Sequence, residues 1–438
     1  MFTRQATKVL RSLRKDNSCV RVQKRNHPIT LSLRNSSTKV VIIGGGAMGA
    51  SAAYWLTQKS GNCNVTVIEK DPTYANCSTS RSVGGIRQQF SIPENIQMSL
   101  FGAKFIKNLK NQFGPEADIS YAPNGYLILA SPQGAQQLAQ NFKLQQELGS
   151  TNTLMTKDQL REKLKWLNVD DIELGCMGCE KEGWFDPWGL LTLFKSAAVS
   201  KGAQFVQGEV KNFIFSNDKN LKSVKVHLPN QDKKVFEFDT CVLAAGAESG
   251  AIARMAGIGT GQGDLSVALP VEPRKRYVYR FDSQGKNVPP VNSPLMIDYT
   301  GVYFRKDGPV FIGGRSPDSH EEPPADNLEV DFSYFDNTVW PLLAARIPAF
   351  ESVKVQSAWG GFYEYNTFDA NGIIGPHSTF KNLFFATGFS GHGIQQSPAV
   401  GLAIAELILD GKFKTIDLKR MGFDRLIKQQ PLYEIGIY

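Results

Sequence analysis

The sequence predicts an α/β protein in which a discontinuous domain with a parallel sheet is interrupted by an α+β domain with a mixed or antiparallel sheet. Three observations support this prediction. A strand, a glycine loop, a helix and a second strand follow one another over residues 39–69. Residues 240–247 and 382–393 also run from an apolar strand into glycines. Polar, strand-rich stretches such as 276–281 and 302–305 lie between these segments and indicate a separate, inserted sheet.

The composition is that of a globular protein, and its positive charge is confined to the first residues. Of the 438 residues, 42% are hydrophobic, 21% are charged and only 6 are cysteines, which excludes a disordered chain and a disulfide-rich scaffold. The net charge is +8, from 49 basic and 41 acidic residues, and nine of the basic and one of the acidic residues lie in residues 1–38. The remaining chain is therefore neutral, and no nucleic-acid partner is expected.

Residues 1–38 are predicted to be a mitochondrial presequence. Apolar residues gather on one face of a helical wheel, basic residues lie opposite, and acidic residues are almost absent, which is typical of such segments. A disordered basic tail is the alternative. We expect the mature chain to begin shortly before Lys39. No membrane span is expected, because the longest uncharged run, residues 40–58, is rich in glycine. The apolar residues on the one face of this predicted presequence helix are Phe2, Ala6, Val9, Leu10 and Leu13.

The first motif has the form of a Rossmann-like dinucleotide-binding unit. Gly44, Gly46 and Gly49 fit the pattern G-x-G-x-x-G between a strand and a helix. The first glycine allows the tight turn, the second lets the backbone approach a pyrophosphate, and the third lets the helix pack against the sheet. Glu69 ends the second strand and would accept hydrogen bonds from ribose hydroxyls, which disfavours NADP. This motif alone does not separate NAD from FAD.

A second glycine loop favours FAD. The strand 382–388 leads into the loop 389–393 and then into a helix that should end near Leu409. The N-terminus of that helix would stabilise negative charge, which a flavin acquires at its pyrimidine end on reduction. The glycine-rich run 257–263 has the wrong spacing and follows a helix-like segment, so no second nucleotide domain is expected. Electrons would then come from an organic substrate or a protein partner.

These motifs resemble, in the same order, those of the D-amino-acid oxidase and sarcosine dehydrogenase superfamily of FAD oxidoreductases. The resemblance covers nearly all of residues 39–420 and includes 82–87, 186–189 and 243–246. It implies an FAD whose isoalloxazine faces the substrate domain. The cofactor-binding residues that it implies are Gly44, Gly46, Ala47, Met48, Gly49, Glu69, Gly84, Gly85, Val210, Gly246, Gly388, Ser390, Gly391, Gly393 and Ile394.

Five segments resemble more specifically one mitochondrial member of this superfamily, which is associated with the assembly of respiratory complex I. This resemblance implies an oxidoreductase of the mitochondrial matrix, with complex I subunits or assembly intermediates as partners and with an unknown electron donor and acceptor. Peripheral attachment to the inner membrane stays open. The alternatives are a catabolic amine or amino-acid dehydrogenase and a non-enzymatic assembly chaperone with a structural FAD. The segments are 270–279, 313–317, 357–359, 363–369 and 388–396.

The site departs from the family pattern at positions that matter for chemistry. Gly361 stands where several members carry a flavin-linked cysteine, and residues 81–84 lack the attachment histidine, so FAD is expected to be non-covalent. The lysine and the arginine that hold the substrate carboxylate in sarcosine oxidases are replaced by Gln395 and Phe90. Because a buried carboxylate needs a charge partner, a simple N-methyl amino acid is disfavoured as the main substrate.

The catalytic candidates are Arg87, His392 and Tyr363. Arg87 would pair with the flavin or with a substrate carboxylate; otherwise it is a surface arginine. His392 would hydrogen-bond beside the flavin, although a loop-fixing role through bonds to backbone carbonyls is favoured. Tyr363, Tyr365 and Tyr303 would line a pocket, although aromatic residues in such sheets usually serve packing.

No metal site is expected, because the C-x-x-C pair Cys176 and Cys179 lacks a second pair of ligands, and two free thiols are the simpler interpretation. The predicted FAD-binding domain comprises residues 39–115, 185–270 and 371–420, the substrate or cap domain residues 116–184 and 271–370, and the C-terminal tail residues 421–438.

Overall fold

The structure is a computed structural model that describes residues 37–217 and 220–436. The predicted presequence, residues 1–38, lies outside the described residues except for its last two positions, and it stays a prediction. Residues 37–438 form one compact unit. Along the described ranges, none of the helices is both long enough and apolar enough to cross a membrane.

A six-stranded sheet forms the dinucleotide-binding part. Its strands are short apolar runs with both faces covered, as expected for parallel strands. Neighbouring strands are parallel except for β18, which pairs antiparallel with β19. In spatial order the strands are β18 (Ile373–Pro376), β19 (Leu383–Thr387), β12 (Thr240–Leu243), β1 (Thr38–Ile43), β2 (Cys63–Glu69) and β8 (Gln204–Gln207).

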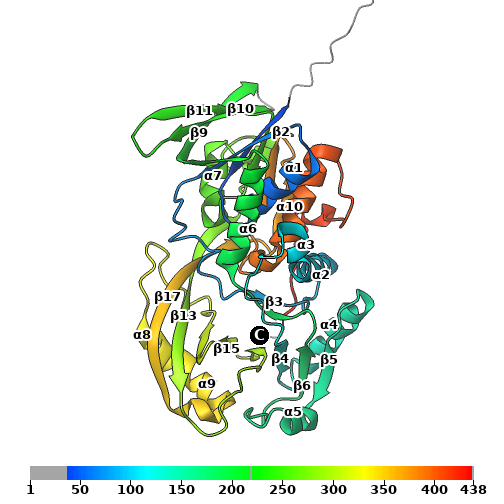
Figure 1. Cartoon of the computed structure of the whole chain (residues 1–438), viewed down its shortest axis with the longest axis vertical. Coiled ribbons are helices and arrows are strands. Elements are labelled where there is room, and N and C mark those ends of the chain that lie inside the picture. Colours follow the sequence, from blue (N-terminus) through cyan, green and yellow to red (C-terminus); the bar gives the residue numbers. More distant parts are fainter. Residues whose placement is uncertain (1–36, 218–219, 437–438) are drawn as a thin grey trace, which may run out of the picture. The chain divides into compact units, whose positions relative to one another are not determined.

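Three helices cover this sheet: α1 (Ala47–Lys59), α6 (Pro187–Ser200) and α10 (Gly393–Asp410) (Figure 1). Asp186 caps α6, because its carboxylate accepts hydrogen bonds from the backbone N–H groups of Trp188 at 2.9 Å and Gly189 at 3.0 Å. The helix α10 ends one residue beyond the predicted position. Gly411 follows it in the left-handed conformation, with a φ of 70°.

An eight-stranded mixed sheet forms the second part. All its pairs are antiparallel except β14 with β4. The long strands β13 and β17 lie side by side, in register from Val271 opposite Asn366 to Ser283 opposite Val353 (Figure 1). In spatial order the strands are β17 (Val353–Asn366), β13 (Val271–Ser283), β16 (Val310–Arg315), β15 (Val302–Asp307), β14 (Leu295–Ile297), β4 (Tyr126–Ala130), β6 (Leu174–Gly178) and β5 (Thr153–Thr156).

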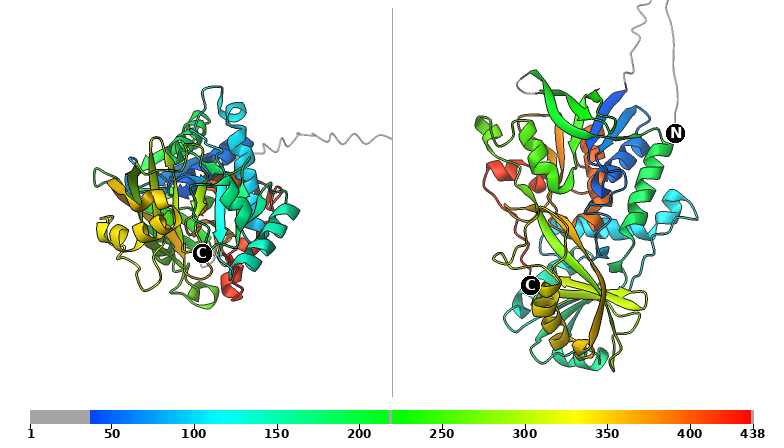
Figure 2. Two further views of the ribbon diagram at one scale, coloured as in Figure 1. Left: turned by 90° about the horizontal axis from the view of Figure 1, so that it is seen from below. Right: turned by 90° about the vertical axis from the view of Figure 1, so that its left-hand side faces the viewer.

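The second sheet has its own aromatic core. Phe281, Phe304, Phe311 and Phe350 are fully buried in one cluster, and the ring centroids of Phe311 and Phe350 lie 4.8 Å apart. The helices α8 (Phe332–Tyr334) and α9 (Trp340–Arg346), drawn in yellow, lie beside β13 and β17 (Figure 2). This part therefore has a hydrophobic interior independent of the parallel sheet.

The remaining described strands and α-helices flank these two sheets. They are β3 (Gly85–Ile86) paired with β7 (Gly183–Trp184), the sheet of β9 (Glu209–Asn217), β10 (Asn220–His227) and β11 (Lys233–Glu237), and the helices α2 (Pro93–Lys107), α3 (Leu109–Phe113), α4 (Ala135–Glu147), α5 (Lys157–Lys163), α7 (Ser249–Met255) and α11 (Asp424–Ile427).

The chain crosses between the two large sheets more than once, which confirms the predicted fold class. The six-stranded sheet takes its strands from residues 38–69, 204–243 and 373–387, and the eight-stranded sheet takes its strands from residues 126–178 and 271–366. The parallel sheet is thus discontinuous in sequence, and a mixed sheet is inserted into it. The finer boundaries assigned to the domains stay a prediction.

Candidate functional site

A cavity of about 1420 Å³ lies between the two large sheets. Gly44, Glu69 and Ala244 line it from the carboxyl ends of parallel strands, and Tyr303 and Tyr363 line it from the mixed sheet. The carboxyl ends of parallel strands are where open α/β sheets bind ligands. The cavity exceeds the range of about 300–1,000 Å³ that is usual for small ligands, so an extended ligand fits.

The glycine loop after β1 brings backbone groups to this cavity. Gly44 has a φ of +98°, and a β-carbon there would lie 2.2 Å from a backbone oxygen just after β12. A β-carbon at Gly49 would lie 1.9 Å from the carbonyl oxygen of Gly44. Gly46, Ala47 and Met48 line the cavity at the N-terminus of α1. This end of α1 therefore offers backbone N–H groups and a partial positive charge to a phosphate.

Glu69 lines the cavity at the end of β2, but part of its hydrogen-bonding capacity is used within the chain. Its Oε2 accepts from the backbone N–H of Gly45 at 2.8 Å, and its Oε1 accepts from that of Asp71 at 2.9 Å. Because each carboxylate oxygen accepts more than one hydrogen bond, capacity remains for the predicted ribose contact. Val210, near the start of β9, also lines the cavity.

The second glycine loop lies at the other end of the cavity, before α10. Ser390 and Gly391 both have positive φ, at 49° and 98°. A β-carbon at Gly391 would lie 2.5 Å from the ring of Tyr363, so this position requires glycine. His392 is the N-cap of α10, and its side chain makes no capping hydrogen bond. The N-terminus of α10 therefore faces the cavity through Gly393 and Ile394, which line it.

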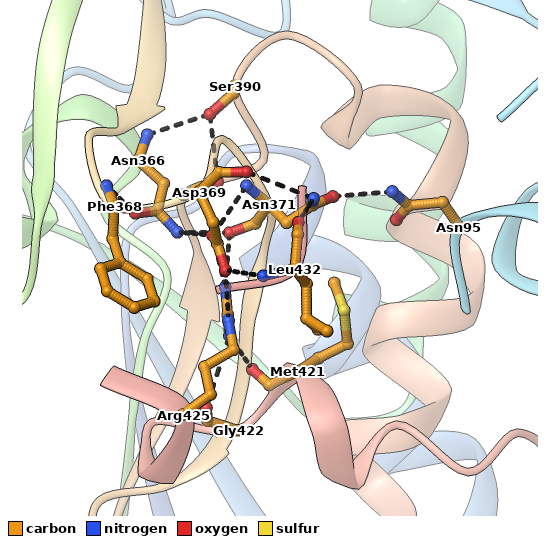
Figure 3. Close-up of polar contacts among 11 residues, drawn as sticks. Asn95, Asn366, Phe368, Asp369, Asn371, Ser390, Met421, Gly422, Arg425 and Leu432 are labelled. Atoms are coloured by element: carbon orange, nitrogen blue, oxygen red, sulfur yellow. Dashed lines mark hydrogen bonds and ion pairs between the residues drawn. The ribbon is translucent and has the colours of Figure 1, made fainter. Parts of the chain in front are cut away.

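A buried polar network fixes this loop from behind, as Figure 3 shows. The backbone N–H of Asn366 donates to Ser390 Oγ at 2.9 Å, and Asn366 Nδ2 donates to Asp369 Oδ1 at 2.9 Å. Arg425 of α11 donates from Nε to Asp369 Oδ2 at 2.7 Å and from Nη2 to Oδ1 at 3.0 Å. The backbone N–H of Leu432 also donates to Asp369 Oδ2, at 3.0 Å. The C-terminal segment thus supports the loop of Ser390.

Arg87 lines the substrate end of the cavity and is held on several sides. Its guanidinium carbon lies 4.8 Å from the ring centroid of Phe90 and 5.6 Å from that of Tyr126. Its Nη2 lies 3.3 Å from His392 Nε2, and its backbone N–H donates to Gln395 Oε1 at 2.8 Å. Phe90 and Gln395, which the resemblance predicts to stand at two carboxylate-binding positions of sarcosine oxidases, therefore both contact Arg87.

A buried carboxyl group, Glu182, supports the backbone next to Arg87. Its Oε1 accepts from the backbone N–H of Gln88 at 2.6 Å, and its Oε2 accepts from Gln89 Nε2 at 2.7 Å. Burial raises the pKa of Glu182 to about 7, against the opposing effects of these hydrogen bonds and of the Arg87 charge. Glu182 does not line the cavity, so it acts on the site through residues 87–89.

His392 is a neutral group in this site. Burial first, and then the charge of Arg87, lower its pKa to about 3. Beside a guanidinium donor, Nε2 must be the accepting nitrogen, which leaves the proton on Nδ1. The predicted loop-fixing bonds to backbone carbonyls do not occur among the described residues: the ring contacts Arg87 and packs edge-on against Phe90, with 5.2 Å between centroids.

The tyrosines from the mixed sheet face the cavity, whereas aromatic residues in such sheets usually pack in the interior. Tyr303, Tyr363 and Tyr365 all line it. Arg276, which sequence reasoning missed, lines it as well, with its guanidinium 5.4 Å from the ring centroid of Tyr363. Two parallel hydrogen bonds of 2.8 Å already join Arg276 to Glu322. Its charge is therefore balanced before any ligand binds.

Most of the predicted residues lie together at the cavity, and three of them lie behind its wall. Arg87, His392 and Tyr363 line it, whereas Gly49, Gly84 and Gly388 do not. Gly49 and Gly84 permit close backbone approaches: at Gly84, a β-carbon would lie 2.0 Å from the carbonyl oxygen of Phe185. Gly388 instead has a positive φ of 82°. The predicted cofactor residues that line the cavity are Gly44, Gly46, Ala47, Met48, Glu69, Gly85, Val210, Gly246, Ser390, Gly391, Gly393 and Ile394.

In the part of the chain that the structure describes, the cysteines give no sign of metal or disulfide chemistry. Cys176 is buried in β6, Cys179 is exposed, and both are free thiols. Burial raises the pKa of Cys176 to about 12, so its thiol stays protonated. Within residues 37–217 and 220–436, no group of three or more His, Cys, Asp or Glu side chains could hold a metal ion.

FAD fits the residues around this cavity. The dinucleotide end offers the side-chain-free backbone of Gly44 and Gly46. Tyr74 also lines the cavity, and its buried hydroxyl has no hydrogen-bond partner among the described residues, so a polar ligand atom would satisfy it. The N-termini of α1 and α10 supply positive potential at the two ends. The fold and site thus define a protein of the FAD-binding oxidoreductase class.

Comparison with known proteins agrees with this class. The chain matches the family described as "FAD dependent oxidoreductase" over residues 39–407 and belongs to this family. It is 48% identical over 422 residues to FAD-dependent oxidoreductase domain-containing protein 1 of Xenopus laevis, covering 91% of this chain and 84% of that protein. Proteins of the same name in Bos taurus and Mus musculus are 46% and 43% identical.

More distant similarities are to enzymes that are named for amino-acid substrates. The glycine oxidase of Bacillus subtilis is 23% identical over 394 residues, covering 88% of this chain and 97% of that protein. The crystal structure of L-proline dehydrogenase from P. horikoshii has a TM-score of 0.77 and is 26% identical, covering 91% of this chain and 100% of that chain. The chain is therefore an FAD-dependent oxidoreductase by fold, related to amine and amino-acid oxidoreductases.

Proposed function

We propose that this protein binds FAD without a covalent bond and oxidises a C–H bond beside the nitrogen of an amine or amino acid. The observation that carries the proposal is one continuous cavity, which joins the glycine loop of α1 to Arg87, His392 and Tyr363. When bound, FAD supplies the acceptor for a hydride from such a C–H bond. The similarity to glycine oxidase and L-proline dehydrogenase supports the class of donor.

The residues at the substrate end would bind and orient the donor. Arg87 brings a positive charge to a cavity wall that is otherwise rich in tyrosine. His392 and Gln395 fix the position of this charge through the contacts at 3.3 and 2.8 Å. Because its pKa is lowered to about 3, His392 is a weak base at neutral pH. Its role is therefore to position Arg87, and the donor has to lose its ammonium proton before oxidation by another route.

Side chains near the cavity support non-covalent binding. Gly361, at the position of the linking cysteine in several relatives, lines the cavity without a side chain. Cys77 also lines it, but burial raises the pKa of its thiol and disfavours the nucleophilic thiolate. Acid precipitation of the purified protein should leave all flavin in the supernatant. Flavin that stays with the pellet would contradict this part of the proposal.

We also propose that this oxidoreductase acts in mitochondria in the assembly of respiratory complex I, in the matrix or peripherally on the inner membrane. The support for this proposal is the resemblance of five segments to a mitochondrial member of the superfamily that is associated with complex I assembly. The identity of 43–48% to one group of relatives over most of the chain agrees with a close relationship to a single member. Complex I subunits or assembly intermediates would be the partners.

The substitution Gly46→Asp tests both proposals in cells that lack the wild-type protein. It places a carboxylate at the N-terminus of α1, where the pyrophosphate would lie, and should abolish FAD retention and complex I assembly together. The matched control is Gly61→Asp, because Gly61 is exposed, does not have a positive φ, and a β-carbon there meets no atom within 4 Å. Normal assembly by a Gly46→Asp protein without FAD would show that the flavin is irrelevant to the assembly role.

A further inference from the structure

Glu364 is a half-buried carboxyl group of the cavity wall that the proposed function does not yet use. It belongs to β17 and lines the cavity, and the part of its surface that remains open faces this internal space. Its Oε2 accepts from the hydroxyl of Thr387 at 3.0 Å and from the backbone N–H of Gly388 at 3.2 Å. Protein atoms therefore satisfy one carboxyl oxygen.

The other oxygen lies at the N-terminus of α10. A β-carbon at Gly393 would lie 3.2 Å from Glu364 Oε1, and Gly393 itself lines the cavity. Among the ion pairs of residues 37–217 and 220–436, none includes Glu364. A ligand that fills the cavity would exclude solvent from a carboxyl group that has no ion-pair partner among these residues. Burying an unpaired charge costs several kcal/mol, so a proton would be bound instead.

We propose that Glu364 takes up a proton from solvent when FAD binds and that, as the neutral acid, it donates a hydrogen bond from Oε1 to an acceptor atom of the flavin ring. The proton converts the carboxylate to a carboxylic acid, and no other bond is made or broken. This inference rests on the proposed binding of FAD. It assigns Glu364 as a cofactor-binding residue whose protonation sets the affinity for FAD.

The charges around Glu364 agree with this assignment. Burial raises its pKa to about 7, against the hydrogen bonds from Thr387, Gly388 and the backbone of residue 389. The dipole of α10 lowers the pKa of Glu364 and so acts against the effect of burial, because a helix N-terminus favours an anion. From the loop before α10, His392 is uncharged at neutral pH. From β13, Arg276 carries a charge that Glu322 already pairs. The charge of Glu364 therefore changes near neutrality.

The test is the dissociation constant of FAD, measured by the quenching of flavin fluorescence on addition to the full-length apoprotein at pH 6.5 and 8.5. If the free protein titrates near pH 7 and the complex keeps the proton, the dissociation constant rises about 25-fold between these pH values. Glu364→Gln keeps a hydrogen-bond donor but does not titrate, and its dissociation constant should change less than about twofold over the same range.

Glu182→Gln is the matched control, because Glu182 also has a pKa raised by burial to about 7 but does not line the cavity. It should keep the pH dependence of the wild type. A wild-type dissociation constant that does not change with pH would overturn the inference while leaving the proposed function intact. A Glu364→Gln variant whose dissociation constant changes with pH as much as that of the wild type would do the same. If the wild type binds no FAD at either pH, the proposed function itself fails.

Discussion

Replacement of Arg425 by methionine tests how the C-terminal segment supports the second glycine loop, residues 389–393. Methionine keeps much of the side-chain volume but removes the charge and all donors. In the structure, Arg425 donates two hydrogen bonds to Asp369, and others to the backbone oxygens of Asn371 at 2.9 Å and Met421 at 2.6 Å. The side chains of the ion pair are 4% and 0% exposed. The substitution therefore leaves a carboxylate buried without its cation.

The expected loss follows from that geometry. Breaking a buried ion pair by removing one partner costs about 3–5 kcal/mol. Three donors to Asp369 remain, from Asn366, Asn371 and Leu432, so we expect the lower end, about 3 kcal/mol. The double variant Arg425→Met, Asp369→Asn removes the uncompensated charge. It should be more stable than the single variant by at least about 1 kcal/mol.

The assay is urea unfolding of the full-length chain, followed by tryptophan fluorescence and circular dichroism, with midpoints compared at equal slopes. Lys428→Met is the matched control in the same segment, because Lys428 pairs with Asp424 at 4.0 Å and is 62% exposed. It should cost less than about 1 kcal/mol. If Arg425→Met costs no more than Lys428→Met, the ion pair with Asp369 does not hold this segment, and the reasoning is wrong.

Two further substitutions probe the glycine turn and the interior. Gly44→Val should yield protein with no bound flavin, measured as the flavin-to-protein absorbance ratio, because its β-carbon would lie 2.2 Å from a backbone oxygen at a φ of +98°; a wild-type ratio would contradict the assigned turn. His377 is buried and accepts two backbone hydrogen bonds at Nδ1, and burial lowers its pKa to about 4. As the pH falls below about 6.5, the imidazole of residue 377 is protonated in the unfolded chain but not yet in the folded protein, so the folded state loses stability. From pH 7 to pH 5 the free energy of unfolding of the wild type should fall by about 2 kcal/mol more than that of His377→Asn. Equal losses in the two proteins would refute this prediction.

The elements with strong local signals could be predicted from the sequence. Apolar runs followed by glycines located β1, β12 and β19, and the β1–α1–β2 unit has the predicted glycine pattern. The resemblance to the FAD oxidoreductases predicted Arg87, His392 and Tyr363 as site residues, and all three line one cavity although Arg87 and His392 are 305 residues apart. Such motifs work because a turn with positive φ or a close backbone approach admits few residue types.

Other features depend on contacts that no single segment encodes. Glu364 follows Tyr363 in an ordinary strand, and its importance appears only when Thr387 and Gly388 are placed against it. The ring of His392 contacts Arg87, 305 residues away in the chain, instead of backbone carbonyls. Arg425 and Asp369 also pair across 56 residues. Side-chain pairs of this kind are tertiary, so periodicity and motif spacing do not reveal them.

The most direct test of the central claim is the absorbance spectrum of the purified full-length protein during anaerobic addition of amino acids and N-methyl amino acids. The account predicts a bound flavin, released as free FAD on denaturation, whose absorbance bleaches when a donor with a C–H bond beside nitrogen is added. A bound FAD that none of these compounds reduces would contradict the assignment as an amine or amino-acid oxidoreductase and would favour a structural role for the cofactor.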